Sequence, residues 1–102
     1  MQALPEADVV ITNPTHYAVA LKYDSELYAA PMVIAKGADY LAAKIKEEAK
    51  SCHIEIYENK PLARMLYANV DVGAQIPAEL YPAVAEVLAY VYHIRDQKAG
   101  RL

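Results

Sequence analysis

Phenylalanine and tryptophan are missing from this 102-residue chain, and its large aromatic residues are nine tyrosines. Tyrosine supplies apolar bulk but has a hydroxyl group that needs a partner, so we expect many of these rings to be half-buried. Cysteine occurs only at Cys52, which excludes an internal disulfide and favours a reducing compartment. Because no other Cys or His lies at ligand spacing from Cys52 and His53, the sequence predicts no metal site.

Long apolar runs and runs of one charge are missing as well. No segment reaches the roughly 18–20 apolar residues that a membrane-spanning helix needs. The first six residues lack the basic and apolar regions of a signal peptide. The net charge is −3, with scattered lysine and arginine, which argues against binding to nucleic acid. No phosphate-binding loop or Ser-His-Asp set is present, so we expect no cofactor and no enzyme that turns over an external substrate.

Four short segments have the composition of β-strands. The expected strands are 9–11, 17–23, 31–35 and 54–57. The first is a β-branched run that meets a turn at Asn13-Pro14, and Gly37 is expected to stop the third. These lengths suit one small sheet.

Helical spacing of apolar residues predicts the remaining elements. The expected helices are 38–50, a short one opened by Pro61, and a last one that begins at Pro77 or Pro82. The expected inward-facing residues are Leu41, Ile45 and Ala49, then Leu62, Met65 and Leu66, then Leu80, Val84, Val87, Leu88 and Val91. The polar tail 97–102 is expected to fray. The sequence therefore predicts an α/β fold of the α+β type. We expect one soluble, cytoplasmic domain over 1–102, with a sheet of about four strands surrounded by about four helices.

The motif Asn13-Pro14-Thr15-His16 carries the chemistry that the sequence indicates. An asparagine reacts with its own backbone by two routes. In one, the nitrogen of the next residue attacks the side-chain carbonyl, but proline has no N–H and cannot be that nucleophile. In the other, the Asn13 amide nitrogen attacks the Asn13 backbone carbonyl, closes a succinimide ring and expels Pro14 as a new N-terminus. Good alignment contributes up to about 7–11 kcal/mol to such an intramolecular step.

Thr15 and His16 are suited to assist this reaction. An imidazole titrates near neutrality and can move protons. Thr15 can bond to the developing oxyanion through its hydroxyl or its N–H. Asn-Pro is also a common start of an ordinary turn that Thr15 and His16 would only cap, and on four residues alone this is the simpler interpretation.

Longer blocks of sequence resemble one protein family. The first block is Ala-Asp-Val-Val-Ile-Thr-Asn-Pro-Thr-His-Tyr-Ala-Val-Ala-Leu at 7–21, and the others are 30–39, 61–67, 73–77 and 83–90. In this order they resemble the cytoplasmic (C-terminal) domain of the FlhB/YscU/SpaS family of type III secretion export switch proteins. Tyr-Ala-Val-Ala-Leu after the motif is most like the flagellar branch.

The resemblance implies self-cleavage between Asn13 and Pro14, with Thr15 and His16 completing the catalytic motif. Residues 1–13 would stay paired as a strand against 14–102. The cut would permit the flagellar export apparatus to change from rod and hook components to filament components. It is a single intramolecular event, without turnover.

The family also implies partners and a location. The partners are other export gate components, the export ATPase complex, a hook-length ruler protein and export substrates. The location is the cytoplasmic face of the bacterial inner membrane. Family members have an N-terminal membrane domain, so we interpret Met1 as the start of a soluble piece or of a short stand-alone paralogue.

A docking patch for export substrates is implied at Ala30, Pro31, Ala85 and Leu88. Helical spacing alone predicts ordinary core positions for Ala85 and Leu88, and an exposed loop edge for Ala30-Pro31. Arg64 is expected to be exposed. Two alternatives to the flagellar switch remain: an injectisome (virulence secretion) homologue, and an uncleaved paralogue that docks export substrates.

Overall fold

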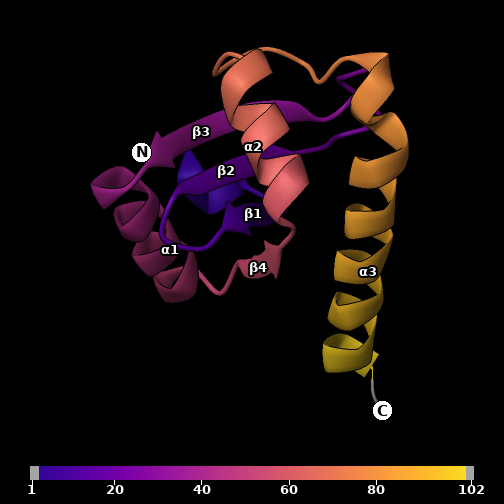
Figure 1. Cartoon of the computed structure of the whole chain (residues 1–102). Helices are drawn as coiled ribbons and strands as arrows, with labels where there is room; N and C mark the ends of the chain where they lie inside the picture. The colour runs from indigo at the N-terminus through magenta and orange to yellow at the C-terminus, as the bar shows by residue number, and fades with distance from the viewer. Residues whose placement is uncertain (1–2, 101–102) are drawn as a thin grey trace.

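A four-stranded mixed sheet with the strand order β3-β2-β1-β4 organises the fold (Figure 1). The computed structural model describes residues 3–100, with side chains up to Lys98. Its elements are η1 (Leu4–Glu6), β1 (Val9–Asn13), β2 (Tyr17–Lys22), β3 (Met32–Ala38), α1 (Tyr40–Ser51), β4 (Glu55–Glu58), α2 (Lys60–Asn69), η2 (Ala78–Leu80) and α3 (Tyr81–Gly100). β1 pairs antiparallel with β2 and parallel with β4, and β2 pairs antiparallel with β3. β1 is therefore an interior strand with a bonded neighbour on each side.

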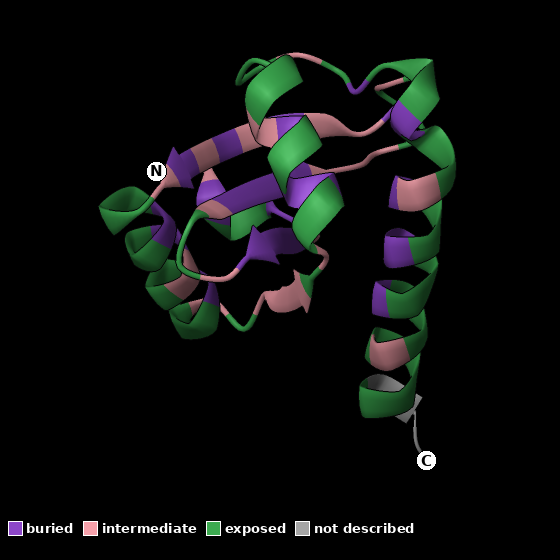
Figure 2. Cartoon of the chain, in the orientation of Figure 1, coloured by how far each residue is buried: buried purple, intermediate pink, exposed green. Residues whose placement is uncertain are grey.

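Helices cover both faces of this sheet. Because side chains alternate along a strand, Val9 and Ile11 of β1 face one side and Val10 faces the other. The side of Val9 and Ile11 packs against α2, η2 and α3. The side of Val10 packs against η1 and α1. Figure 2 shows buried residues along the strands and on the sheet-facing stripes of the helices.

The predicted α+β class and single sheet are confirmed. About four helices were predicted, and the described residues contain three α-helices and two single-turn 3-10 helices. α3 continues to Gly100, so the tail is helical where fraying was predicted to begin. Residues 1–2 of the predicted short fragment and 101–102 of the predicted tail lie outside the described residues.

Two residues predicted to face inward are exposed. Leu41 is 55% exposed and Met65 is 46% exposed. α1 instead buries Ala42, Ile45 and Ala49, and α2 buries Leu62, Ala63 and Leu66. Both errors have the same cause. When small and large apolar residues are neighbours on a helix, the spacing alone leaves the buried face uncertain by one position. The other predicted inward positions are buried.

The prediction that Gly37 stops the third strand was wrong. β3 continues through Gly37, which pairs with Ala18 of β2, and ends at Ala38. A Cβ atom at Gly37 would lie 2.6 Å from the Cβ of Leu41 and 3.1 Å from its backbone carbonyl carbon. The glycine therefore allows α1 to pass close to the strand, and α1 begins at Tyr40 rather than at residue 38.

Replacing Gly37 by alanine is expected to lower the free energy of unfolding by about 1–3 kcal/mol, because the helix backbone must move away from the strand. Urea unfolding measures this loss, and the Leu41 amide shift reports the movement of α1. The control is Gly73→Ala, where a Cβ atom meets nothing within 4 Å and only the backbone angle φ of +91° opposes the change. An unfolding free energy equal to that of the parent chain would contradict the close approach.

Candidate functional site

The predicted motif forms the hairpin turn between β1 and β2. Asn13, the last residue of β1, pairs with Tyr17, the first residue of β2, so residues 14–16 form the loop. The N–H of His16 donates a hydrogen bond to the Asn13 carbonyl oxygen at 2.9 Å. Proline fixes φ at about −65°, and Thr15 has a φ of +72°, which together are typical of a type II turn.

Thr15 has a backbone conformation that β-branched residues rarely adopt. Type II turns normally have glycine or asparagine at this position, where a positive φ is required. A β-branched residue there stores strain on the order of 1–3 kcal/mol. This strain lies in the residue that follows Pro14, next to the bond predicted to break.

The side chain of Asn13 is buried and has no hydrogen-bond partner among the described residues. The residue is 6% exposed, and no described residue forms a hydrogen bond with its side-chain amide. Almost all buried polar side chains have a partner, and leaving one without costs about 1–3 kcal/mol. The amide nitrogen is therefore not held away from its own backbone by any described residue.

Backbone hydrogen bonds hold the chain on both sides of the Asn13-Pro14 bond. The Thr12 carbonyl accepts from the Asn59 N–H at 2.9 Å, and the His16 carbonyl accepts from the Asp39 N–H at 2.9 Å. Asp39 and Asn59 are the residues that precede α1 and α2. The N-terminal ends of both helices thus lie at this end of the sheet, and their dipoles favour negative charge there.

The His16 imidazole is open to solvent. Its side chain is 66% exposed, and its Nδ1 lies 4.0 Å from Oδ1 of Asp39, whose side chain is 81% exposed. A pair this exposed adds little stability. Asp39 was not predicted, because only the pairing of β2 with β3 brings it beside His16. The sequence suggested Thr15 as the donor to the carbonyl of the bond predicted to break, but the N–H of His16 has that position.

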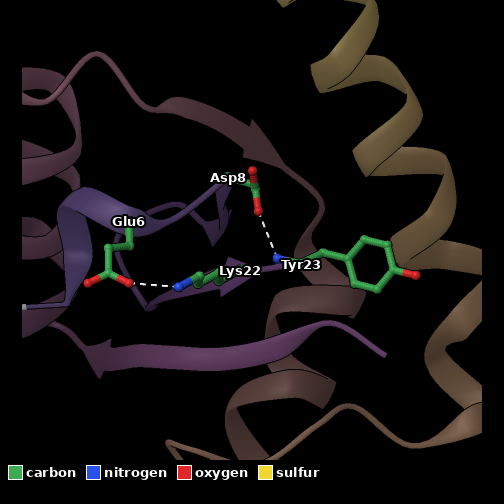
Figure 3. Close-up of polar contacts among 4 residues, drawn as sticks. All are labelled: Glu6, Asp8, Lys22 and Tyr23. Carbon is green, nitrogen blue, oxygen red and sulfur yellow. Dashed lines mark hydrogen bonds and ion pairs between the residues drawn. The ribbon is translucent and has the colours of Figure 1, made fainter. Parts of the chain in front are cut away.

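Residues 3–13 are bound to the rest of the domain along their length. Their buried apolar residues are Leu4, Ala7, Val9, Val10 and Ile11. Glu6 Oε1 lies 2.7 Å from Nζ of Lys22 (Figure 3). This hydrogen bond and the charge of Lys22 lower the pKa of Glu6, and the same bond raises the pKa of Lys22. Asp8 forms a second ion pair, to Arg95 of α3.

Three residues of the predicted docking patch line one apolar pocket. The pocket has a volume of about 170 Å³ and is lined by Tyr23, Ala29, Pro31, Tyr81, Ala85 and Leu88. Ala30 is 1% exposed and outside the lining, so the prediction of an exposed edge there was wrong, and Ala29 takes its place. The core position predicted from spacing was also wrong for Ala85, which is exposed beside the buried Leu88.

Other kinds of site find no support in the described part of the chain. No group of three or more His, Cys, Asp or Glu side chains there is placed to hold a metal ion. No helix among residues 3–100 is both long enough and apolar enough to cross a bilayer. Arg64 is exposed, as predicted. The predicted residues point to two candidate sites, the Asn13–His16 turn and the apolar pocket.

Comparison with known proteins identifies relatives of this arrangement. A sequence profile described as the FlhB HrpN YscU SpaS family matches residues 1–91. The flagellar biosynthetic protein FlhB of Bacillus subtilis is 52% identical over 97 residues, which are 95% of this chain and 27% of that protein. The chain thus spans about a quarter of the length of the curated relatives that it matches.

Solved structures agree with the sequence match. The cytoplasmic domain of FlhB from Shewanella putrefaciens superposes with a TM-score of 0.93 at 49% identity, covering 98% of this chain and 77% of that one. A mutated EscU C-terminal domain has a TM-score of 0.85 at 31% identity, covering 88% and 90%. The EscU structures include changes of an asparagine and of the proline that follows it. The higher identity to FlhB confirms the predicted likeness to the flagellar branch.

Proposed function

Because the chain belongs to the FlhB HrpN YscU SpaS family, we propose that it is the switch domain of a flagellar type III export component and cuts itself between Asn13 and Pro14. The observation that carries this proposal is the buried Asn13 amide, which has no hydrogen bond to any described residue. It lies at the end of an interior strand, directly before a proline and a strained turn. An ordinary turn does not require this combination of features.

The reaction balances within the motif. The Asn13 side-chain nitrogen forms a bond to the Asn13 carbonyl carbon, and the carbonyl oxygen gathers negative charge. The N–H of His16, 2.9 Å from that oxygen, stabilises this charge. The bond to Pro14 then breaks, the proline nitrogen gains a proton, and the side-chain nitrogen loses one. Asn13 becomes a C-terminal cyclic imide, and the exposed imidazole of His16 is suited to exchange the protons with water.

The cut occurs once and leaves the fold intact. The segment 1–13 supplies the interior strand β1, whose removal would separate β4 from β2. Its buried residues and its ion pairs to Lys22 and Arg95 would keep it in place without the peptide bond. The domain is therefore a switch whose product is its own nicked form, and it does not act on a separate substrate.

The switch serves the order of export. We assign to the cut the change from rod and hook components to filament components, at the cytoplasmic face of the bacterial inner membrane. The partners are the other export gate components, the export ATPase complex and a hook-length ruler protein. Higher identity to flagellar FlhB than to EscU favours the flagellar apparatus over an injectisome.

Export substrates are the ligands that fit the apolar pocket. Its lining is tyrosine, alanine, leucine and proline, and its volume of about 170 Å³ suits one or two apolar side chains of a peptide. Pro31 and Ala85 line it from two different elements, the segment before β3 and α3. An uncleaved docking module would use the same pocket, so the cut itself must be tested separately.

Intact-mass measurement tests the cut. The purified chain, incubated at neutral pH and then denatured, is expected to give two species, with the larger one beginning at Pro14. Native size-exclusion chromatography of the same sample is expected to give one peak, because the two pieces stay paired. One uncut mass after long incubation would favour the uncleaved docking module.

A further inference from the structure

Asp8 joins two parts of the chain that are otherwise far apart in sequence. Its Oδ2 accepts a hydrogen bond from the Tyr23 N–H at 2.7 Å (Figure 3). Its Oδ1 lies 3.2 Å from Nη1 of Arg95, and its backbone carbonyl accepts from Nη2 of Arg95 at 3.1 Å. The Asp8 side chain is 16% exposed, so both oxygens are used in a largely dry setting where such bonds are strong.

One partner of Asp8 lines the apolar pocket, and the other lies on the helix that supplies the rest of the lining. Tyr23, just after β2, forms one wall together with Ala29 and Pro31. α3 forms the other wall with residues about two to four turns before Arg95, namely Tyr81, Ala85 and Leu88. Figure 3 shows the Tyr23 ring extending from the strand end towards α3. Asp8 therefore spans the gap between the walls without lining the pocket itself.

Neighbouring contacts fix this arrangement at the α3 side. The Arg95 guanidinium lies 5.5 Å from the centre of the Tyr92 ring. Burial and the charge of Asp8 raise the pKa of the Tyr92 hydroxyl, as expected for a phenol near this carboxylate. Tyr57 of β4 meets Tyr90 of α3 edge to face at 5.3 Å. The Arg95–Tyr92 contact lies within α3, and the Tyr57–Tyr90 contact joins the second half of α3 to β4, the strand beside β1.

We infer that Asp8 is the positioning residue of the apolar pocket, holding Tyr23 and α3 at the separation that admits an apolar peptide. The inference rests on the proposed docking function and extends it to regulation. Asp8 lies on the segment 1–13, so the cut at Asn13-Pro14 leaves the pocket bridged by a residue that is no longer covalently attached to either wall. Loosening of that segment would then change which peptides the pocket accepts.

Glu6 supplies a matched control. Like Asp8, it is an acidic residue of the short segment, and it bonds to Lys22, the residue before Tyr23. Its partner does not line the pocket, and its own side chain is 61% exposed. Glu6→Gln therefore removes an ion pair between the same two segments while leaving both walls untouched.

The experiment compares Asp8→Asn, Arg95→Gln and Glu6→Gln by methyl NMR. Labelled methyl groups of Ala29, Ala85 and Leu88 report the pocket, and an acetylated leucyl-leucine amide is the titrated probe. Asp8→Asn and Arg95→Gln are expected to shift these methyl signals in the same way. Each is also expected to lower the affinity for the probe by roughly threefold to tenfold. In the double variant the two effects are expected not to add, because one bridge is broken twice. Glu6→Gln should leave signals and affinity unchanged.

Two outcomes separate the inference from the function on which it rests. Arg95→Gln changes an exposed side chain and leaves the core intact. If its methyl signals did not move, the role of Asp8 would be overturned, whatever the affinity for the probe. Methyl signals that move as expected while the parent chain fails to bind the probe would support the positioning role and count against docking. If Glu6→Gln changed the methyl signals and the affinity as much as Asp8→Asn does, the inference would be overturned. Any loosening of segment 1–13 would then be enough to alter the pocket, without a special role for Asp8.

Discussion

Asn13→Ala is expected to remain a single chain of 102 residues under conditions in which the parent separates into 1–13 and 14–102. The variant has no side-chain nitrogen to attack the Asn13 carbonyl, so the ring cannot close. It should fold at least as well as the parent, since it removes a buried amide that has no partner among the described residues. Intact mass of the denatured sample measures the cut, and thermal unfolding measures the fold.

Asn13→Asp is the matched control for this result. The replacement keeps the size and shape of the side chain but exchanges the nitrogen for a carboxylate oxygen, which can close only an anhydride and, when ionised, brings no proton for the departing proline nitrogen. It is expected to stay uncut at neutral pH. If Asn13→Ala still produced a chain beginning at Pro14, cyclisation would be the wrong mechanism, and an external protease or attack by water would replace it. A cut in Asn13→Asp alone would point to the anhydride route.

Pro14→Ala separates the two reactions open to an asparagine. Alanine restores an N–H at position 14, which can attack the Asn13 side-chain carbonyl, the route that proline forbids. The expected products are an uncut chain and a slow rise in mass from deamidation. Rapid cutting of Pro14→Ala at the same bond would show that the tertiary amide and its restricted geometry contribute little to the reaction.

The candidate cleavage motif could be proposed from the sequence because its residues are local. Asn13, Pro14, Thr15 and His16 are consecutive, and the N–H that bonds the Asn13 carbonyl belongs to the same turn. The first predicted strand is also present. Val9 and Ile11 pack on one face of the sheet and Val10 packs on the other, as expected of a strand that is buried on both faces. What lay within a few residues could be predicted from the chemistry of those residues.

Contacts made across the sheet could not be predicted in this way. Asp39 reaches His16 only through the register of β2 and β3, and Arg95 reaches Asp8 only because α3 crosses the end of β1. Gly37 was misread because glycine both ends strands and permits close packing, and only the position of Leu41 decides between the two. Tyr23 and Tyr81 carried no signal for a pocket, since the segments that form it are far apart in sequence.

Ile11→Ala is expected to have different consequences in the cut and uncut forms. Ile11 is fully buried in β1, between Val19 of β2 and Tyr57 of β4. Truncation of such a residue costs about 2–5 kcal/mol through lost burial and the cavity left behind. In the Asn13→Ala background the chain is continuous, so the loss should lower the unfolding midpoint by an amount independent of protein concentration.

In the cleavable background, the same loss of free energy weakens the association of 1–13 with 14–102. Once the peptide bond is gone, the folded domain is a complex of 1–13 with 14–102, and its stability depends on concentration by mass action. A loss of 2 kcal/mol or more weakens that complex by roughly thirtyfold or more. Dilution followed by size-exclusion chromatography should therefore release the short segment from Ile11→Ala at concentrations where the cut parent stays whole. A midpoint independent of concentration in the cut variant would contradict a strand held only by packing and pairing. We expect a nicked domain to be stable because an interior strand has neighbours on both sides. Residues such as Ile11, rather than the peptide bond, would then set its hold on the short segment.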